Sequence, residues 1–404
     1  MATRHSEASA RSIRALFDLP RYILVAVERW AGWARLTLVP KNTRFRCPRC
    51  RITVCDGRPS RWRLLRDLDI GRRHVELCVQ VYRVWCCGCG QSEVRITLAR
   101  EYARSTRRLE EHLFRLTADS TVKAVAGRMS LDWETVKDAE VRYIRGLLRK
   151  RHLDGITRLG FDEVSYKKGH KYLTLVTDLV WHRVIYATHG NDGRAISRFL
   201  EWFGPKRCER VKVVVTDMHD PYVRVLRDRM PNAALVFDHF HMSKVVHDAL
   251  DNIRRRLQRE LPPAGRRIIK GQRYVLLRAR EKLTKKQHVS LQEILKVNTD
   301  LTKGYVLTEA FRDVFTATSL GDGRRRLKVW AAQVLESRVP ELLKVLETIK
   351  RRRNGIDNFF RYRIANGMAE GFNNVVGTIK KQAYGFHDRD YLRLKILRIC
   401  GKLE

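Results

Sequence analysis

The sequence predicts a multidomain protein in which a strand-rich region, a short all-α region and a larger α/β region follow one another. Three observations support this fold class. The 404 residues exceed what one hydrophobic core usually organises. Seven of the nine cysteines lie between Cys47 and Cys89. Between Leu159 and Asp238, short apolar strand patterns alternate with amphipathic helix patterns.

The charge of the chain is strongly positive. It carries 82 Lys and Arg against 44 Asp and Glu, a formal net charge of +38. Such an excess repels itself unless a polyanion neutralises it, so nucleic acid is the first partner to expect, with an anionic membrane surface as the alternative. The polar N-terminus and the short apolar stretch 23–27 do not have the length of a signal core or a membrane span, which predicts a cytoplasmic protein without a membrane partner.

Residues 1–100 are predicted to form the first domain, built of strands around the cysteines. Apolar alternation from Tyr22 to Val27 and from Val75 to Val84 indicates strands. Two cysteine pairs have the two-residue gap that lets thiolates turn back onto one tetrahedral ion. In a reducing compartment this clustering indicates a metal site rather than disulfides. We therefore predict a zinc ribbon with a structural Zn²⁺ bound by Cys47, Cys50, Cys86 and Cys89.

Other roles for the cysteines stay open at this point. Cys87 could replace Cys86, although its one-residue gap to Cys89 makes a poorer metal-binding turn. A set of buried or incidental thiols would also give a cluster of cysteines. Cys55 and Cys78 are expected to be packing residues.

Residues 101–152 are predicted to form a second, all-α domain. One helix is expected to end near Arg128, and after a short turn a second helix is expected to begin at the cap residue Asp132. The apolar residues of the first helix should face Trp133, Val136 and Val141. This spacing is typical of a helix-turn-helix, although any two helices joined by a turn look similar. In that motif the early exposed residues of the second helix lie near DNA base edges, and here they are Glu134, Thr135 and Lys137.

Two aspartates of the remaining region, residues 153–404, are candidate metal ligands. Asp162 lies in LGFDEV before a predicted hairpin turn at KKGH, and Asp217 closes the apolar strand VKVVVTD. A carboxylate after a hydrophobic strand is held rigidly at the edge of a sheet, although a capping or turn aspartate gives the same local pattern. Carboxylates that bridge two divalent ions are suited to phosphoryl transfer on DNA.

Glu370 is the third candidate acid. A helix with one buried face is predicted from the spacing of Phe372, Val375, Val376 and Ile379. Glu370 begins the opposite, polar face, which continues through Asn374 and Lys381, with Lys380 adjacent, and suits a metal ion and a phosphate backbone. An ordinary solvated face would also be polar, but it does not explain two adjacent asparagines, which are poor helix formers.

A further polar group ends the strand pattern ALVFD. Asp238, His239 and His241 should approach the same rim as Asp217 and assist a metal or orient DNA, although hydrogen bonding or packing is the commoner use of such residues. From Lys244 onward the pattern becomes helical and basic, with 13 Lys or Arg against 3 acidic residues between Asp251 and Ser290. Loops are predicted at PPAG (262–265) and GDG (321–323).

The order of these motifs resembles a known family. The cysteine ribbon and the helix-turn-helix are followed by FDEVSYKKGHKYLTLVTDL, VVVTDMHDPYVRVLRDRMPNAALVFDHFHMSKVV and AEGFNNVVGTIKKQAYGF. Together they resemble the ISL-three family of bacterial insertion-sequence transposases over nearly the whole chain. Two features depart from that family, because Arg51 follows the first cysteine pair where a glycine is usual and the second pair is compressed.

The resemblance implies a metal-dependent polynucleotidyl transferase with a ribonuclease-H-like catalytic domain. Its aspartate, aspartate, glutamate triad matches Asp162, Asp217 and Glu370. An all-α insertion is implied from about 254 to 353. The implied cofactors are two Mg²⁺ or Mn²⁺ ions, which suit carboxylate ligands. The implied partners are double-stranded DNA with terminal inverted repeats, target DNA and a second copy of the chain, in the cytoplasm of a bacterium at its nucleoid.

Two rival functions share these features. A DNA-binding regulator derived from an inactive transposase would keep the basic surface, and a ribonuclease-H-like nuclease would hydrolyse DNA without joining strands. The intact triad argues against the regulator, and the ribbon and helix-turn-helix favour an enzyme that reads sequence.

Overall fold

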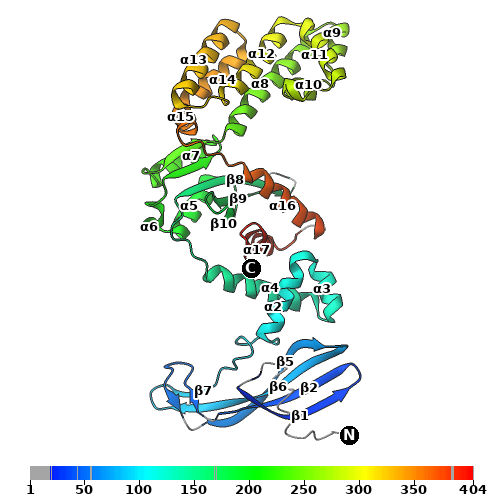
Figure 1. The fold of residues 1–404 in the computed structure, drawn as a ribbon, viewed down its shortest axis with the longest axis vertical. Helices are drawn as coiled ribbons and strands as arrows, with labels where there is room; N and C mark the ends of the chain where they lie inside the picture. Colours follow the sequence, from blue (N-terminus) through cyan, green and yellow to red (C-terminus); the bar gives the residue numbers. More distant parts are fainter. Residues whose placement is uncertain are drawn as a thin grey trace. The chain divides into compact units, whose positions relative to one another are not determined.

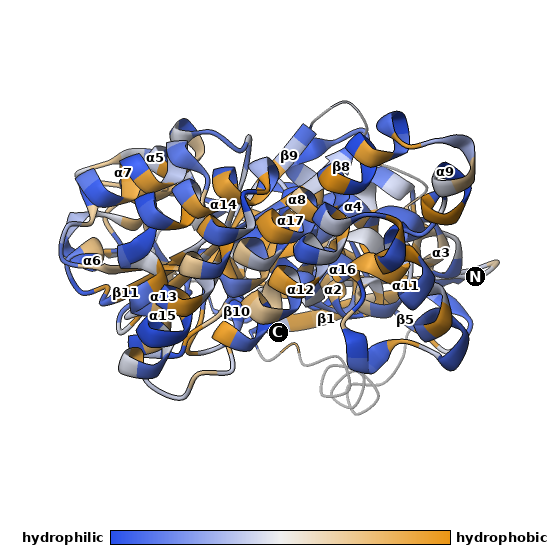
Figure 2. Ribbon diagram, turned by 90° about the horizontal axis from the view of Figure 1, so that it is seen from above, coloured by the Kyte–Doolittle hydropathy of each residue, from blue (hydrophilic) through white to orange (hydrophobic). Residues whose placement is uncertain are grey.

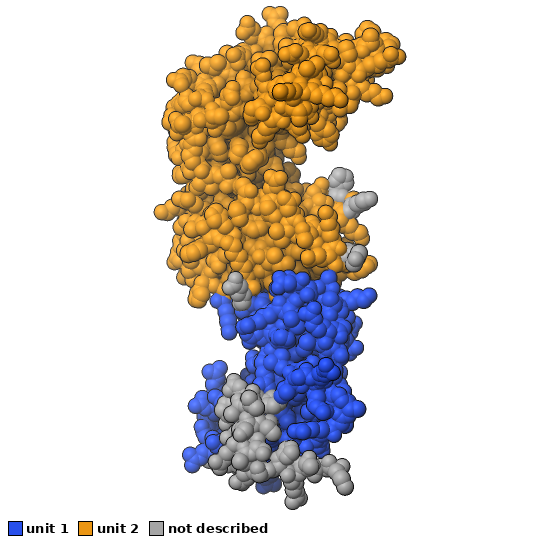
Figure 3. Space-filling model, turned by 45° about the vertical axis from the view of Figure 1, so that its right-hand side comes forward, with its two compact units in different colours: residues 1–150 blue, residues 151–404 orange. Residues whose placement is uncertain are grey.

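The computed structural model describes residues 19, 21–42, 44–54, 57–167, 169, 171–383 and 386–403. The chain forms two compact units, residues 1–150 and 151–404, drawn in blue and orange in Figure 3. The predicted boundary after residue 152 lies two residues from this division. A further boundary near residue 100, inside the first unit, stays a prediction. Cys55, and Lys168 and His170 of the predicted hairpin turn, lie outside the described residues.

The first unit begins with a five-stranded sheet. Its strands are ordered β1-β2-β6-β5, and β7 pairs with β6, while β3 and β4 form a separate pair. The strands are β1 (Tyr22–Trp30), β2 (Trp33–Pro40), β3 (Phe45–Arg46), β4 (Thr53–Val54), β5 (Gly57–Ile70), β6 (Arg73–Cys86) and β7 (Gly90–Glu93). Side chains alternate between the two faces of a strand, so Leu36 and Leu38 of β2 meet Leu77 and Val79 of β6 in one core.

Three helices complete the first unit, and the second and third are the two that the sequence predicts on either side of a short turn. They are α2 (Arg107–Asp119), α3 (Val122–Met129) and α4 (Trp133–Arg149). Thr106 and Thr121 cap α2 and α3 by accepting hydrogen bonds from backbone amides of the first turn. Ser130 takes the left-handed conformation that reverses the chain between α3 and α4. The prediction for Trp133 was wrong, because this residue begins α4 one turn before its buried stripe and is 46% exposed.

The second unit contains a mixed five-stranded sheet in the order β10-β9-β8-β11-β12. Its strands are β8 (Arg158–Lys167), β9 (Lys171–Asp178), β10 (Arg183–His189), β11 (Val213–Thr216) and β12 (Ala234–Phe237). The first three pair antiparallel as a meander, and β11 and β12 run parallel to β8. The strands predicted between 159 and 238 are therefore confirmed.

Helices cover both faces of this sheet (Figure 1). On one face, α5 (Gly193–Phe203) and α7 (Asp220–Arg229), with the short α6 (Pro205–Cys208) between them, bury Phe199 and Tyr222 against Phe161 of β8. Towards the C-terminus, α16 (Met368–Gln382) packs against β8 and α17 (Arg389–Ile399) packs against β10. The sheet is thus the middle of three layers, which holds its strand ends in fixed positions.

A run of helices separates β12 from α16. It comprises α8 (His239–Glu260), α9 (Pro263–Ile269), α10 (Arg273–Leu277), the 3₁₀ helix η1 (Arg280–Lys282), α11 (Lys285–Val297), α12 (Thr299–Val314), α13 (Leu320–Ser337), α14 (Pro340–Arg351) and α15 (Arg353–Tyr362). The helical region is longer at both ends than the predicted 254–353. One continuous core joins its buried residues to Val215, Val236 and Phe237 of the sheet.

Both predicted loops in this region are helix starts. Pro263 to Gly265 open α9, because proline fits the first turn, where its missing N–H would be unpaired in any case. Gly321 to Gly323 form the first turn of α13, which Ser319 caps. A Cβ at position 323 would lie 2.6 Å from the ring of Phe360, so this glycine serves close helix packing rather than a turn.

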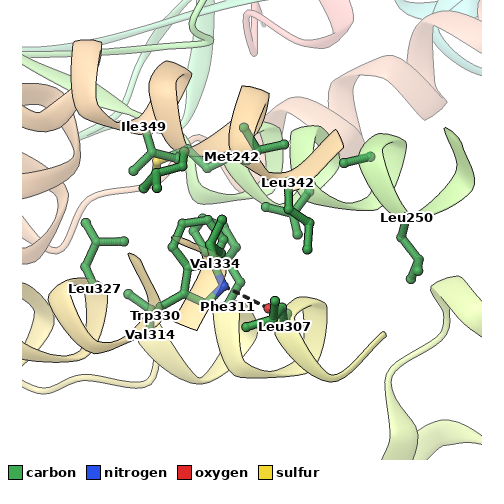
Figure 4. Close-up of a cluster of buried hydrophobic side chains, with 14 of the residues drawn as sticks. Met242, Leu250, Leu307, Phe311, Val314, Leu327, Trp330, Val334, Leu342 and Ile349 are labelled. Carbon is green, nitrogen blue, oxygen red and sulfur yellow. Dashed lines mark hydrogen bonds between the residues drawn. The ribbon is translucent and has the colours of Figure 1, made fainter. Parts of the chain in front are cut away.

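Many helices carry polar residues on one face and apolar residues on the other, and in Figure 2 their ribbons alternate between blue and orange. Trp330 of α13 is the largest buried side chain, and it packs on Phe311 while its Nε1 donates to the Leu307 carbonyl at 2.9 Å (Figure 4). In the described part of the chain, every helix is too short or too polar to span a bilayer.

We expect Trp330→Ala to lower the free energy of unfolding of the second unit by about 3–5 kcal/mol, because it leaves a cavity and removes the hydrogen bond to the Leu307 carbonyl. Val329→Ala is the matched control, since Val329 is the preceding residue and is 54% exposed. It should cost less than about 0.5 kcal/mol. Urea unfolding followed by far-ultraviolet circular dichroism measures both, and similar costs for the two variants would contradict the packing described.

Candidate functional site

Asp162 and Asp217 are brought together by the register of two parallel strands. Val215 of β11 pairs with Gly160 of β8, and continuing this register by two residues places Asp217 beside Asp162. Val213 and Val215 face one core while Val214 faces the other. The alternation therefore directs both carboxylates to the face opposite α5 and α7. Neighbouring strands lie about 4.8 Å apart, which sets the spacing of the two acids.

Asp162 is held by side chains from two helices. Asn373 Nδ2 of α16 donates to Asp162 Oδ2 at 2.9 Å, and His241 Nε2 of α8 lies 3.9 Å from Asp162 Oδ1. Burial raises the pKa of Asp162, the hydrogen bond from Asn373 opposes this rise, and the negative charge of Asp217 adds to it. A nearby cation would relieve both the desolvation and the repulsion between the two acids.

Glu370 lies in the first turn of α16 and is exposed. Contacts on both sides fix its position along the sheet. Four residues earlier, the Asn366 backbone amide donates to Asp238 Oδ2 at 3.2 Å and its side chain reaches the Phe161 carbonyl at 3.5 Å. Three residues later, Asn373 binds Asp162. Glu370 is therefore confined to the stretch of α16 that runs along the rim bearing Asp162.

The three acids are not drawn into one tight cluster. In the described residues, the group of ligand atoms that lie within 4.8 Å of one another consists of four cysteines and does not include these carboxylates. Glu370 forms no ion pair or hydrogen bond with a described side chain. The structure thus places two aspartates side by side and the glutamate on the adjoining helix.

The residues that end β12 have different surroundings. Asp238 is 4% exposed, and its two carboxylate oxygens accept hydrogen bonds from the backbone amides of Phe240 and Asn366. It therefore anchors α8 and the start of α16. His239 packs among aromatic rings, with Phe359 at 5.3 Å between centroids, and burial lowers its pKa. His241 alone of these three residues faces Asp162.

Three residues of this rim were missed by sequence reasoning. Asn373 rather than Asn374 contacts Asp162, although its place three residues after Glu370 also puts it on the same helical face. Glu163 accepts a hydrogen bond from Asn191 at 3.1 Å and lies 3.6 Å from His219 Nδ1. Burial raises the pKa of Glu163, and the charge of Asp217 raises it further. The local sequence gave no separate signal for Glu163 or His219.

The predicted basic residues of α16 also differ from one another. Lys380 Nζ donates to the Ser165 carbonyl of β8 at 3.1 Å, so it fastens the helix to the strand. Asn374 and Lys381 are exposed, as a face that contacts a phosphate backbone requires.

The four predicted cysteines do meet in the first unit. Cys47 and Cys50 lie between β3 and β4, Cys86 ends β6, and Cys89 lies in the turn before β7. Their sulfurs all lie within 4.8 Å of one another, with Cys50 and Cys86 Sγ 3.5 Å apart. Tetrahedral Zn–S bonds of about 2.3 Å place sulfurs about 3.8 Å apart, so the arrangement fits one zinc ion. Cys87 is exposed and is not part of this group.

Backbone geometry explains how both cysteine pairs turn. The amides of Cys50 and Arg49 point at the Cys47 sulfur and lower its pKa to about 6, which favours the thiolate. Each pair is followed by a residue with positive φ, Arg51 at 65° and Gly90 at 71°. A glycine adopts this conformation without strain. Arg51, which stands where the family usually has glycine, is therefore a strained residue in an otherwise regular turn.

In the helix-turn-helix, the predicted contact residues lie at the start of α4. Glu134 is exposed, Thr135 and Lys137 are half-buried, and Lys137 Nζ lies 5.3 Å from the Trp133 ring centroid. α4 packs against α2 and α3 through Val136, Ala139 and Ile144. The predicted contact residues therefore lie at the N-terminal end of α4, outside its buried stripe.

A buried acid fixes the packing of α2 and α4. Glu110 of α2 is fully buried and accepts hydrogen bonds at 2.9 Å from Arg100, which precedes α2, and from Arg142 of α4. One carboxylate thus binds two guanidinium groups from different segments. This pairing compensates the cost of burying its charge.

Carboxylates on neighbouring parallel strands, in a chain that also carries a helix-turn-helix and a four-cysteine cluster, define a protein that processes DNA. A family model described as "Transposase" matches residues 159–396, and one described as "Helix-turn-helix domain of transposase family ISL3" matches residues 94–144. The chain belongs to the transposase family ISL3. It is therefore a DNA-binding enzyme of the polynucleotidyl transferase class.

Curated relatives agree with this assignment. The chain is 31% identical over 356 residues to the transposase for insertion sequence element IS1001 of Bordetella parapertussis, covering 87% of both chains. It is 30% identical over 389 residues to the transposase for insertion sequence element IS1557 of Mycobacterium tuberculosis, covering 88% of this chain and 86% of the relative.

We expect Glu110→Gln to lower the free energy of unfolding of the first unit by roughly 1–3 kcal/mol, because two charge-assisted hydrogen bonds are weakened. Glu111→Gln is the control, since Glu111 forms an exposed pair with Arg115 that contributes at most about 0.5 kcal/mol. Thermal unfolding monitored by circular dichroism gives both values. The Glu110 network would be unimportant if the two variants melted together.

Proposed function

We propose that this chain binds the terminal inverted repeats of an insertion sequence, cleaves DNA at the element ends and joins the freed ends to target DNA. The first unit reads the ends through the start of α4, with Glu134, Thr135 and Lys137 near base edges. The second unit carries the chemistry on a ribonuclease-H-like fold. The order of the five strands and the two layers of helices support that fold.

The observation that carries the catalytic proposal is the shared register of β8 and β11. It sets Asp162 and Asp217 side by side on one face, and α16 brings Glu370 along the same rim. These three side chains act as the ligands of two Mg²⁺ or Mn²⁺ ions, which suit a site made of carboxylates. When bound, the ions activate the attacking oxygen and stabilise the leaving oxygen of the phosphodiester.

The protein residues around the acids have roles of their own. Asn373 orients Asp162 by donating to one carboxylate oxygen, which leaves the other oxygen for a ligand. His241 faces that second oxygen at 3.9 Å. Asn374 and Lys381 contact the DNA backbone from the exposed face of α16. Lys380 holds α16 on β8, so the position of Glu370 follows that of the strand.

The arrangement has consequences for partners. Joining two ends to one target requires both ends in one complex, so we propose a homo-oligomer of at least two chains on double-stranded DNA. Cytoplasmic residence at the bacterial nucleoid follows from that substrate.

We expect Glu370→Gln to reduce cleavage and strand transfer by about 10³-fold or more while binding to the ends is retained, because it removes one ligand charge at an exposed position. Asp162→Asn and Asp217→Asn should behave alike. The assay uses a duplex that carries the element's own end, with Mg²⁺ or Mn²⁺.

Glu347→Gln is the control for this assay, since Glu347 is an exposed glutamate of α14 with 67% of its side chain accessible. A parent protein that binds the ends but never cleaves would identify a DNA-binding regulator. Cleavage without joining would identify a nuclease.

We also propose that Cys47, Cys50, Cys86 and Cys89 bind one structural Zn²⁺. The closed set of four sulfurs leaves no open ligand position, which is the mark of structural rather than catalytic zinc. The ion would fasten the β3–β4 segment to the β6–β7 turn, two segments that the short strands alone hold weakly.

Elemental analysis should therefore find about one Zn²⁺ per chain in the parent, and Cys47→Ser should lose it together with stability of the first unit. Cys87→Ser is the matched control, because Cys87 lies next to Cys86 but outside the cluster. It should retain the metal. Zinc loss in the Cys87 variant would instead assign Cys87 as a ligand.

A further inference from the structure

The first unit contains a large cavity that the proposed function does not use. It has a volume of about 1130 Å³ and lies between the sheet, the segment 94–107 and the second half of α4. Its lining includes ten arginines, two glutamates and no lysine. We call this feature the arginine groove. It lies within one compact unit, so its shape does not depend on how the two units are arranged.

Some of the arginines are paired with other protein groups and hold the walls of the groove together. Buried Glu110 binds Arg100 and Arg142 and thereby fixes the segment before α2 against α4. Arg61 forms a bidentate ion pair with Glu93. Arg63 donates to the carbonyls of Arg100 and Ala103, so the chain at this wall is tied to β5. The groove is therefore a preformed structure.

Four further arginines remain available to a ligand. Arg104 and Arg107 line the groove from the segment 94–107, Arg145 and Arg149 line it from α4, and all four are exposed. Within the described residues, none of them has a carboxylate within 4.0 Å or a side-chain hydrogen bond. Burial lowers the pKa of Arg63, and the neighbouring charge of Arg61 lowers it further.

The lining indicates the chemistry of the ligand. The lining holds ten guanidinium groups against two carboxylates, and buried Glu110 compensates two of the ten. The four free arginines favour a partner with repeated negative charge. Arginine forks bind phosphate oxygens through two parallel hydrogen bonds, which a lysine cannot do. A single phosphate or carboxylate would neutralise one or two of the free arginines. A phosphodiester chain supplies a charge at every step and neutralises both walls.

The arginine groove lies at some distance from the residues at the start of α4 that are proposed to contact base edges. Arg145 lies ten residues after Thr135, so the two are about 15 Å apart along the axis of α4. The major groove of DNA is about 12 Å wide. When the start of α4 contacts base edges, the arginines further along the same helix therefore lie beyond that groove, at the phosphates that border it.

We propose that the arginine groove binds the phosphodiester backbone of DNA next to the site read by the start of α4. This inference rests on the proposed function, since it assigns a second contact to the same DNA. The two contacts have different tasks, because backbone contacts add affinity without reading sequence. Tyr102, 88% exposed and in a strained left-handed conformation with φ of 59°, lies at the same groove, where it can contact sugar or base.

The test compares binding of the full chain to a duplex with the element's end and to a scrambled duplex of equal length, by fluorescence anisotropy over a series of salt concentrations. Arg145→Ala with Arg149→Ala should weaken binding to both duplexes by the same factor, about tenfold to sixtyfold near 0.1 M salt. The slope of log K against log salt should become shallower by about 1.8, for two lost phosphate contacts.

Arg72→Ala with Arg73→Ala is the charge-matched control, since both residues are exposed at the β5–β6 hairpin and lie outside the groove. It should leave affinity and slope nearly unchanged. Arg145→Lys with Arg149→Lys should restore most of the slope but only part of the affinity. Arg104→Ala with Arg107→Ala tests the opposite wall, and circular dichroism verifies the fold of each variant.

Each outcome decides between the proposals. If the parent prefers the end duplex and the groove variants bind like the parent, the groove inference is overturned while DNA reading by α4 stands. Equal losses in the groove and hairpin variants reduce the effect to net charge and also overturn it. A loss confined to the end duplex would make these arginines base readers instead. If the parent binds neither duplex, the proposed function fails as well.

Discussion

The parallel pairing of β8 with β11 is the constraint on which the candidate active site depends. The acids reach one another from positions 55 residues apart in sequence because the backbone ladder fixes their register. A slip of one residue would turn one carboxylate to the opposite face, among the side chains of α5 and α7. The apolar residues before each acid therefore serve the site, since their burial on the correct faces holds the register.

Much of this could be predicted from the sequence. Strand patterns located β8 to β12, the cysteine spacing identified the four cysteines whose sulfurs lie together, and the helical period placed Glu370 on a polar face. Contacts between distant segments could not be predicted, because local patterns do not record them. The bond from Asn373 to Asp162 and the use of Asp238 as an anchor are of this kind. GDG was misjudged because Gly323 makes room for Phe360, 37 residues away.

Acidic and basic side chains are concentrated in different parts of the chain. Burial raises the pKa values of Asp162 and Glu163, and the charge of Asp217 raises both further, so this part of the site favours cations. In the first unit the excess is arginine, organised by the buried Glu110 and left free where the groove is open. The formal charge of +38 therefore coexists with a local acidic rim around Asp162.

The helical region between β12 and α16 shares its core with the sheet. Val215, Val236 and Phe237 are buried by side chains of these helices, and a Cβ at Gly355 would lie 2.3 Å from the Phe237 ring. The helical region therefore covers one face of the sheet and cannot be deleted without exposing that face. A shortened enzyme made by joining residue 238 directly to α16 would expose that face to water and would need a new apolar cover designed for it.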